Sequence, residues 1–513
     1  MSAQARIKRL ASETAVYGVS SIVGRLINFL LFPLYSQVFA PDVYEPIIVL
    51  YAAFIFLNIL YQHGMESSYL KFATDRDELQ GRSKAFSTAL ISVVILSILL
   101  SVVVWFARGS VGSIVGLSPD YQHLFSFAAL IMLLDAVAVV PFADLRLRNR
   151  PWLFAGIRVA NIVVNVTLNI VLIFVFELGI EAILIANVIA SATSVVLLVP
   201  VSWPRFSSFD PGLWKKMIRF GMPFVPGGLG YAITERVNIF FLERMDPETV
   251  QRLYGLDAAT HPELHERALS QGMDVYTQHI VGTYGGMIKL AVLMALFVQM
   301  FRYAWQPFFL QRQHDTDAPE LYSKVFGVLT LVLLSAFLGI AFLADDLVGI
   351  PLPGGRTLIA SGYWMGLSII PIALVGYVFQ GWYYHFSAGA YLRDRSRYFL
   401  HATLVGSAVA ILLNAFLVPD YGMWAAALAT SAAYTAMALT LLFLIRRHYP
   451  IDYRWNRIIP ACVTTAVFFF TWYYFGQLQT WWIELLMVSA FALLAAKILK
   501  IPILRSIASL LGR

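Results

Sequence analysis

Apolar runs of about twenty residues recur along the whole chain and are separated by short polar segments. Such a run is long enough to cross the hydrocarbon core of a bilayer as a helix. The pattern predicts an all-α integral membrane protein with about 14 transmembrane helices. The expected spans lie near residues 16–39, 46–66, 85–107, 122–142, 152–175, 179–201, 218–242, 280–301, 323–344, 361–385, 398–418, 422–445, 458–476 and 481–499.

The composition agrees with this class. Of the 513 residues, 59% are hydrophobic and 13% are charged, whereas an average soluble domain has about 25% charged residues. The single cysteine, Cys462, excludes an internal disulfide and disfavours a cysteine-based metal site. No small-residue cleavage site follows the first apolar run, so we expect a retained helix rather than a signal peptide. We expect no cofactor, no metal and no nucleic-acid partner.

The basic residues predict the orientation. If the N-terminus is cytoplasmic, most of the 37 Lys and Arg residues fall in cytoplasmic segments, as the positive-inside rule requires. The basic group Arg146, Arg148 and Arg150 follows the fourth span, for example. An even number of spans then places both termini in the cytoplasm.

The chain also repeats one pattern. Alanines four residues apart follow Gly179 in the sixth span and Gly422 in the twelfth, and an aromatic-glycine pair opens the first and seventh spans, Tyr17-Gly18 and Phe220-Gly221. Two halves with the same even number of helices run in the same sense across the membrane. We therefore expect two six-helix lobes around a central cavity, followed by a terminal helix pair. The expected boundaries are 1–201, 202–450 and 451–513.

A polar insertion at about residues 246–279 interrupts the second half, where the first half has only a short loop. His261 and His265 stand at the spacing of one helical turn, which would suit two ligands of a metal ion. A solvated loop or a short surface helix is the favoured interpretation.

Arg25 stands near the middle of the first apolar run, and Ser21, Asn28 and Tyr35 share its helical face. A charge at this depth costs about 2.5–3.5 kcal/mol on insertion scales. Such a face requires contact with protein or with a watery cavity rather than with lipid.

Other spans contain further polar residues. The cations and amides that we consider as substrate ligands, besides Arg25 and Asn28, are Arg158, Asn161, Asn165, Arg236, Lys289 and Arg302. Three acids, Glu66, Asp135 and Glu235, are candidates for coupling to an ion or a proton. Any one charge is explained equally well by an ion pair between helices. The four cations inside spans, Arg25, Arg158, Arg236 and Lys289, together cost on the order of 10 kcal/mol. They outnumber the two mid-span acids, Asp135 and Glu235, which predicts a cavity for an anion such as phosphate.

Several segments resemble one known family. They are Gly24 to Asn28 with Pro33 to Tyr35 in the first span, Gly179 to Ala190 in the sixth, Phe220 to Pro226 in the seventh, and Val281 to Met294 with Phe301 to Phe309 in the eighth. The chain resembles bacterial polysaccharide-biosynthesis proteins of the O-antigen flippase type, within the multidrug/oligosaccharidyl-lipid/polysaccharide exporter superfamily. The resemblance implies two lobes around a cavity in which Arg25 and Lys289 meet a pyrophosphate. The long insertion departs from the family pattern.

The resemblance implies a flippase rather than an enzyme. It would move an undecaprenyl-pyrophosphate-linked oligosaccharide, an O-antigen or related repeat unit of lipopolysaccharide, across the bacterial cytoplasmic membrane by alternating access. The expected partners are this lipid-linked substrate, membrane lipids, a polysaccharide polymerase and glycosyltransferases. Two alternatives share the fold, a lipid II flippase and a multidrug antiporter. A membrane glycosyltransferase, polymerase or ligase is the alternative of a different class, since acidic and histidine side chains on the insertion would suit catalysis.

Overall fold

The computed structural model describes residues 29–74, 79–312, 315–393, 395, 397–475 and 480–501. These residues form helices joined by short loops, together with a two-stranded antiparallel hairpin of β1 (Pro351–Leu352) and β2 (Arg356–Thr357). The expected all-α membrane fold is confirmed. The chain divides into two compact units, one up to Gly282 and the other from Thr283 onward, which we call unit 1 and unit 2.

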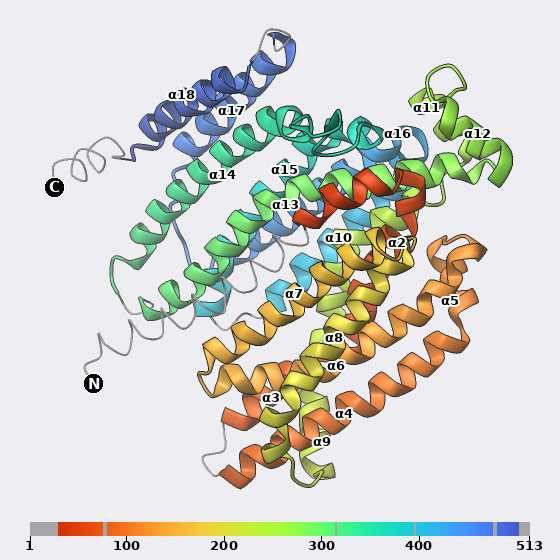
Figure 1. Ribbon diagram of the computed structural model, residues 1–513. Helices are drawn as coiled ribbons and strands as arrows, with labels where there is room; N and C mark the ends of the chain where they lie inside the picture. The colour runs from red at the N-terminus through yellow and green to blue at the C-terminus, as the bar shows by residue number, and fades with distance from the viewer. Residues whose placement is uncertain are drawn as a thin grey trace. The chain divides into compact units, whose positions relative to one another are not determined.

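Unit 1 begins, in its described part, with the short apolar helix Phe29–Val38. The elements that follow are α2 (Pro41–Gln62), α3 (Met65–Thr74), α4 (Leu79–Phe106), α5 (Arg108–Val115), η1 (Pro119–Leu124), α6 (Phe125–Leu147), α7 (Pro151–Phe174), α8 (Glu181–Ser202), η2 (Trp203–Arg205), α9 (Pro211–Gly221), α10 (Phe224–Leu242), α11 (Pro247–Tyr254), α12 (Pro262–Gln271) and the start of α13 (Asp274–Gln311). Helix α6 packs against α4 and α8, and α7 packs against α8 (Figure 1).

Unit 2 contains the rest of α13 and the helices after it. They are α14 (Ala318–Val348), η3 (Ser361–Ile369), α15 (Ile370–Leu392), α16 (Arg397–Ile445), α17 (Trp455–Phe475) and α18 (Trp481–Leu499). An apolar cluster that includes Trp305, Phe309 and Tyr322 forms part of its core, and α15 packs along α16. The units group α9 and α10 with the earlier helices, whereas the sequence repeat groups them with the later ones. The expected lobe boundaries and the internal repeat stay predictions.

Within the described ranges, each expected span overlaps a helix. Eleven helices in the described ranges are long and apolar enough to cross a membrane. One of them, α16, is two helices joined at a kink, where Gly422 has φ 54° and ψ −127°. The remaining expected spans correspond to α10 and to the helix Phe29–Val38. The insertion forms α11, α12 and the first residues of α13, so short surface helices are confirmed there.

Prolines and small polar caps decide where many helices begin. Proline occupies the first turn of α2, α7, α9, α11 and α12, where its missing N–H costs no hydrogen bond. The side chain of Asp210 accepts a hydrogen bond from the Leu213 N–H at the start of α9, and Asp246 accepts one from Thr249 at the start of α11. Pro223 marks a further break, between α9 and α10, because proline interrupts a continuing helix.

The turn between α2 and α3 meets the end of α9 at the end of unit 1 that contains α3 and α9, which we call the α3 end (Figure 1). The turn between α2 and α3 places Gly64 at φ +73°, where a Cβ would lie 2.2 Å from the carbonyl oxygen of Gly221. The hydroxyl of Ser68 donates to the carbonyl oxygen of Met217 at 2.8 Å. The backbone of α9 therefore lies directly against the α2–α3 turn, which only glycine allows at position 64.

Candidate functional site

Helix α8 connects three other helices of unit 1 through polar side chains on one of its faces. Asn187 donates to the Tyr51 hydroxyl on α2 at 3.1 Å, and Ser191 donates to the Asp135 carboxylate on α6 at 2.6 Å. One turn further along, Ser194 accepts a hydrogen bond from the Asn161 amide on α7 at 3.0 Å. The spacing of four and three residues places these α8 side chains on one helical face. We call this group of contacts the polar seam.

Asp135 is the charged member of the polar seam, and Arg158 lies one turn before Asn161 on α7. Both side chains are exposed although they lie within membrane-spanning helices. They interact electrostatically, and Glu66 and Arg146 contribute to the same field around Arg158. Among the predicted site residues, Glu66, Asp135 and Arg158 therefore lie close enough for their charges to interact.

Arg158 rests on aromatic rings. Its guanidinium carbon lies 4.2 Å from the ring centroid of Phe142 and 5.7 Å from that of Phe154. Both rings belong to a buried apolar cluster and pack edge to face at 5.1 Å. Such a cation–π contact holds the guanidinium plane without neutralising its charge. Within the described ranges, no carboxylate forms an ion pair with Arg158.

The asparagines of α7 continue the seam along the helix. Asn169 accepts a hydrogen bond from the Tyr35 hydroxyl at 2.8 Å and donates to the backbone carbonyl of Asn165 at 2.8 Å. Asn161 and Asn165 are half-buried, and Asn169 is fully buried. Tyr35 lies on the face that the sequence assigned to Arg25 and Asn28. Arg25 and Asn28 themselves lie outside the described residues.

Glu66 has a close partner. It forms an ion pair with Arg146, which connects the first turn of α3 to the last turn of α6. About a third of each side chain is exposed, 36% for Glu66 and 37% for Arg146. A structural role for this pair competes with the predicted role of Glu66 in ion coupling.

The remaining candidates lie elsewhere. Glu235 and Arg236 are half-buried on α10 in unit 1. Lys289 and Arg302 lie on α13 in unit 2, also half-buried. Arg302 donates a hydrogen bond to the Tyr384 hydroxyl at 3.3 Å, and its guanidinium lies 5.2 Å from the centroid of that ring. The roles of these four residues in binding or coupling stay predictions.

The sequence analysis did not identify two groups of candidate functional residues. The α8 partners were missed because Asn187, Ser191 and Ser194 are uncharged, although their spacing of four and three in an apolar span was a usable signal. The second group is an acidic cluster around Glu45 and Glu243. Glu45 is fully buried and interacts with Glu243 and Asp42. No sequence pattern relates Glu45 to Glu243.

A histidine and an arginine border this acidic cluster. Arg267 of α12 forms an ion pair with Asp42 at 3.1 Å, and the Nδ1 of His279 lies 3.7 Å from the same carboxylate. On the insertion, His265 Nδ1 is hydrogen-bonded with the Tyr276 hydroxyl at 2.7 Å, and burial lowers the pKa of His261. The described residues contain no group of three or more His, Cys, Asp or Glu side chains arranged to hold a metal ion.

The family model "Polysaccharide biosynthesis protein" matches residues 10–313, more than half of the chain. The chain belongs to this family. The family expected from the resemblance is therefore confirmed. No curated protein sequence matches this polysaccharide biosynthesis protein significantly.

Solved structures share its fold. The lipid II flippase MurJ in an inward closed conformation is similar with a TM-score of 0.73, 13% sequence identity, and coverage of 94% of this chain and 98% of the other. An inward-facing multidrug resistance MATE transporter of the MOP superfamily has a TM-score of 0.61 and 13% identity, with 82% and 95% covered. The eukaryotic MATE transporter AtDTX14 has a TM-score of 0.52 and 17% identity, with 87% and 96% covered. This polysaccharide biosynthesis protein is thus a multi-pass membrane protein with the fold of MOP-superfamily transporters.

Proposed function

We propose that the protein is a flippase that moves an undecaprenyl-pyrophosphate-linked oligosaccharide, an O-antigen or related repeat unit, across the bacterial cytoplasmic membrane by alternating access. Its family membership supports a role in polysaccharide biosynthesis. The similar fold of a lipid II flippase supports a lipid-linked substrate. A polysaccharide polymerase and glycosyltransferases would act on the same repeat unit as partners.

The proposal depends most on the position and surroundings of Arg158. It is an exposed cation within a membrane-spanning helix, held on the Phe142 ring and without a carboxylate ion pair in the described part of the chain. An intramembrane charge of this kind is expensive and marks a site of function. A guanidinium offers paired donors that match phosphate oxygens. Asn161 and Asn165, on the same helix face, are donors and acceptors suited to sugar hydroxyls.

Further predicted residues would complete the site. Arg25, Asn28, Arg236, Lys289 and Arg302 would add positive charge and donors for the pyrophosphate. Asp135, bound to Ser191, would be the coupling acid of the seam, with Glu235 as a further candidate. The lobes at 1–201 and 202–450 would rock about the substrate while the lipid tail stays in the bilayer.

The test is transport by purified protein in vesicles. A fluorescent oligosaccharide on an undecaprenyl pyrophosphate is placed in the inner leaflet, and its arrival outside is followed by quenching with a membrane-impermeant reductant. We expect Arg158→Ala to lower the initial rate at least about tenfold, because charge-assisted hydrogen bonds to phosphate are lost. Arg158→Lys retains the charge but not the fork, so its rate should lie between the two.

Arg252→Ala, which removes an arginine from helix α11 of the insertion, is the matched control and should transport at the wild-type rate. Rates equal to those of protein-free vesicles, or an Arg158→Ala rate equal to wild type, would contradict the proposal. Lipid II and an organic cation are assayed in parallel. Faster movement of either one than of the oligosaccharide would instead favour the lipid II flippase or the multidrug antiporter.

A further inference from the structure

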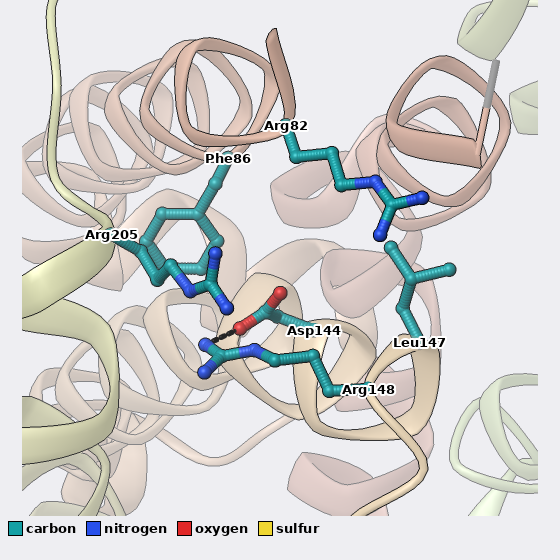
Figure 2. A pocket seen from close by; sticks show the side chains of 6 residues that line it. All are labelled: Arg82, Phe86, Asp144, Leu147, Arg148 and Arg205. Carbon is teal, nitrogen blue, oxygen red and sulfur yellow. Dashed lines mark hydrogen bonds and ion pairs between the residues drawn. The ribbon is translucent and has the colours of Figure 1, made fainter. Parts of the chain in front are cut away.

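The charged residues near the end of α6 form ion pairs. At the α3 end of unit 1, where α6 meets α3, Arg148 pairs with Asp144 (Figure 2). Arg146 of the same helix pairs with Glu66 of α3. Because these carboxylates have basic partners, Asp135 is the acid of α6 that the described residues leave without an ion pair.

Phe142 separates Asp135 from Arg146 along one face of α6. The spacing of seven and four residues places these three side chains on that face. Arg158 of the neighbouring α7 lies with its guanidinium carbon 4.2 Å from the centroid of the Phe142 ring. Among its charged neighbours, Asp135 acts most strongly on Arg158. The guanidinium therefore lies over the ring although a carboxylate that could attract it stands on the same face of α6.

The packing of α6, α7 and α8 fixes the Phe142 ring. Phe142 is 4% exposed and packs edge to face on Phe154 of α7, with the ring centroids 5.1 Å apart. The buried cluster around them also contains Ala138, Leu145, Ile157 and Leu198. Because a close-packed interior resists rearrangement, the ring gives the guanidinium a constant place to rest.

Asp135 has a neutral partner and keeps its charge. Its carboxylate accepts a hydrogen bond from the Ser191 hydroxyl of α8 at 2.6 Å, which leaves its attraction for Arg158 in place. A cation–π contact and an ion pair between exposed groups have similar free energies. The Phe142 ring can therefore offset the attraction between Asp135 and Arg158, and removing the ring would leave that attraction unopposed.

We propose that Phe142 is a positioning residue for Arg158, which it holds apart from Asp135 so that the paired N–H donors stay available to the pyrophosphate of the substrate. This inference rests on the proposed function, in which Arg158 binds phosphate. A ring contact leaves the guanidinium charged, whereas an ion pair with a carboxylate would neutralise it and use the donors that phosphate requires. The apparent affinity falls in proportion to the fraction of molecules in which Arg158 remains free.

The experiment measures the affinity of the purified full-length protein in nanodiscs for farnesyl pyrophosphate, a short prenyl pyrophosphate, by calorimetric titration with empty nanodiscs subtracted. Phe142→Leu should lower the affinity at least about fivefold, because Arg158 then pairs with Asp135 in most molecules. Adding Asp135→Asn, whose amide oxygen can still accept from Ser191, should restore the affinity to within about twofold of Asp135→Asn alone. In an Arg158→Ala background, Phe142→Leu should cause no further loss.

Phe125→Leu is the matched control, because it removes a fully buried ring from the start of α6 that is not one of the rings beside Arg158. It should bind like the wild type. An unchanged affinity in Phe142→Leu would overturn the positioning role. So would a loss that persists in the Asp135→Asn or Arg158→Ala background, since a general packing defect would behave in that way.

The same titration separates this inference from the proposed function. Absence of binding by the wild type would contradict the phosphate-binding role of Arg158 and this inference with it. Binding by the wild type that does not depend on Phe142 would overturn this inference alone. If Phe142→Leu does not fold, Phe142→Met replaces it with the same expectations, because methionine fills the space of the ring without its π face.

Discussion

The carboxyl group of Glu243, just after α10, lies against that of Glu45 in the first turns of α2, although the two are far apart in the sequence. Glu45 is 0% exposed. A Cβ on Gly116, which ends α5 at φ +92°, would lie 2.4 Å from the Glu243 Cγ. Glycine at position 116 therefore makes room for Glu243 beside Glu45. Enclosure beside a second acid favours the protonated form of Glu243.

The first prediction is that Glu243 makes the stability of the protein depend on pH. Burial raises the pKa of Glu243 to about 8 from its usual 4.5, and Asp274 adds to this effect. The contribution is full below the unfolded-state pKa and is lost as the pH rises through the folded-state pKa, so wild-type stability should fall between about pH 5 and pH 8. Glu243→Gln should flatten this decline in thermal unfolding measured across that range.

Other titratable groups nearby include Asp42, His279 and the rest of the acidic cluster, and they remain in both proteins. The difference between the two pH curves therefore reports Glu243 together with its interaction with Glu45. Glu263→Gln, an exposed carboxylate on α12, should leave the wild-type slope intact. Parallel curves for wild type and Glu243→Gln would contradict the expectation.

The second prediction concerns the close approach of Gly64 and Gly221. A Cβ at position 64 would lie 2.2 Å from the Gly221 carbonyl oxygen, and φ there is +73°. Gly64→Ala should therefore lower stability by more than about 1 kcal/mol, because both the contact and the backbone conformation oppose a side chain. Gly156→Ala on α7, where an added Cβ meets nothing within 4 Å, should be neutral or stabilising by about 0.5–1 kcal/mol. Thermal unfolding in detergent compares them, and equal effects would show that the Gly64–Gly221 contact has no special importance.

The third prediction concerns the polar seam. Ser191→Ala removes the 2.6 Å hydrogen bond to Asp135 and should cost about 0.5–1.5 kcal/mol, because the carboxylate loses its donor on α8. Thr193→Ala on the same helix is the control, since Thr193 bonds only to the backbone carbonyl of Ile189 in its own helix. Its cost should stay below about 0.5 kcal/mol. Unfolding curves for the two variants decide whether α8 is held by Asp135, and an equal loss would show that it is not.

The structure also shows how far sequence reasoning reaches. Apolar runs predicted the helices because crossing a bilayer requires length and hydrophobicity, which are local properties. The break before α10 was predictable from Pro223, because the effect of proline on a helix is likewise a local property. The bend at His63 and Gly64 that separates α3 from α2 was not, because that bend depends on contact with α9, a distant segment.

The same distinction between local properties and tertiary contacts applies to the candidate site. Arg158 and Asp135 were found because a charge in an apolar span is conspicuous by itself. Their surroundings were not found: Phe142 under Arg158 and Ser191 on Asp135 are ordinary residues whose importance follows from the packing of α6, α7 and α8. The pairing of Glu45 with Glu243 likewise depends on tertiary contact and leaves no local signal.

The last prediction separates two roles for Glu66, a structural ion pair and an ion-coupling acid. Because Glu66 and Arg146 are each about a third exposed, their coupling in a double-mutant cycle should be about 0.3–1 kcal/mol. Glu66→Gln, Arg146→Gln and the double variant are unfolded thermally and assayed for lipid transport. The exposed pair Glu320 and Lys324 on α14 provides a control cycle with a coupling of at most about 0.5 kcal/mol. If the pair is structural, the double variant transports as well as either single variant. If Glu66 instead binds a coupling ion, Glu66→Gln alone abolishes ion-driven transport whatever residue stands at position 146, and Arg146→Gln alone does not.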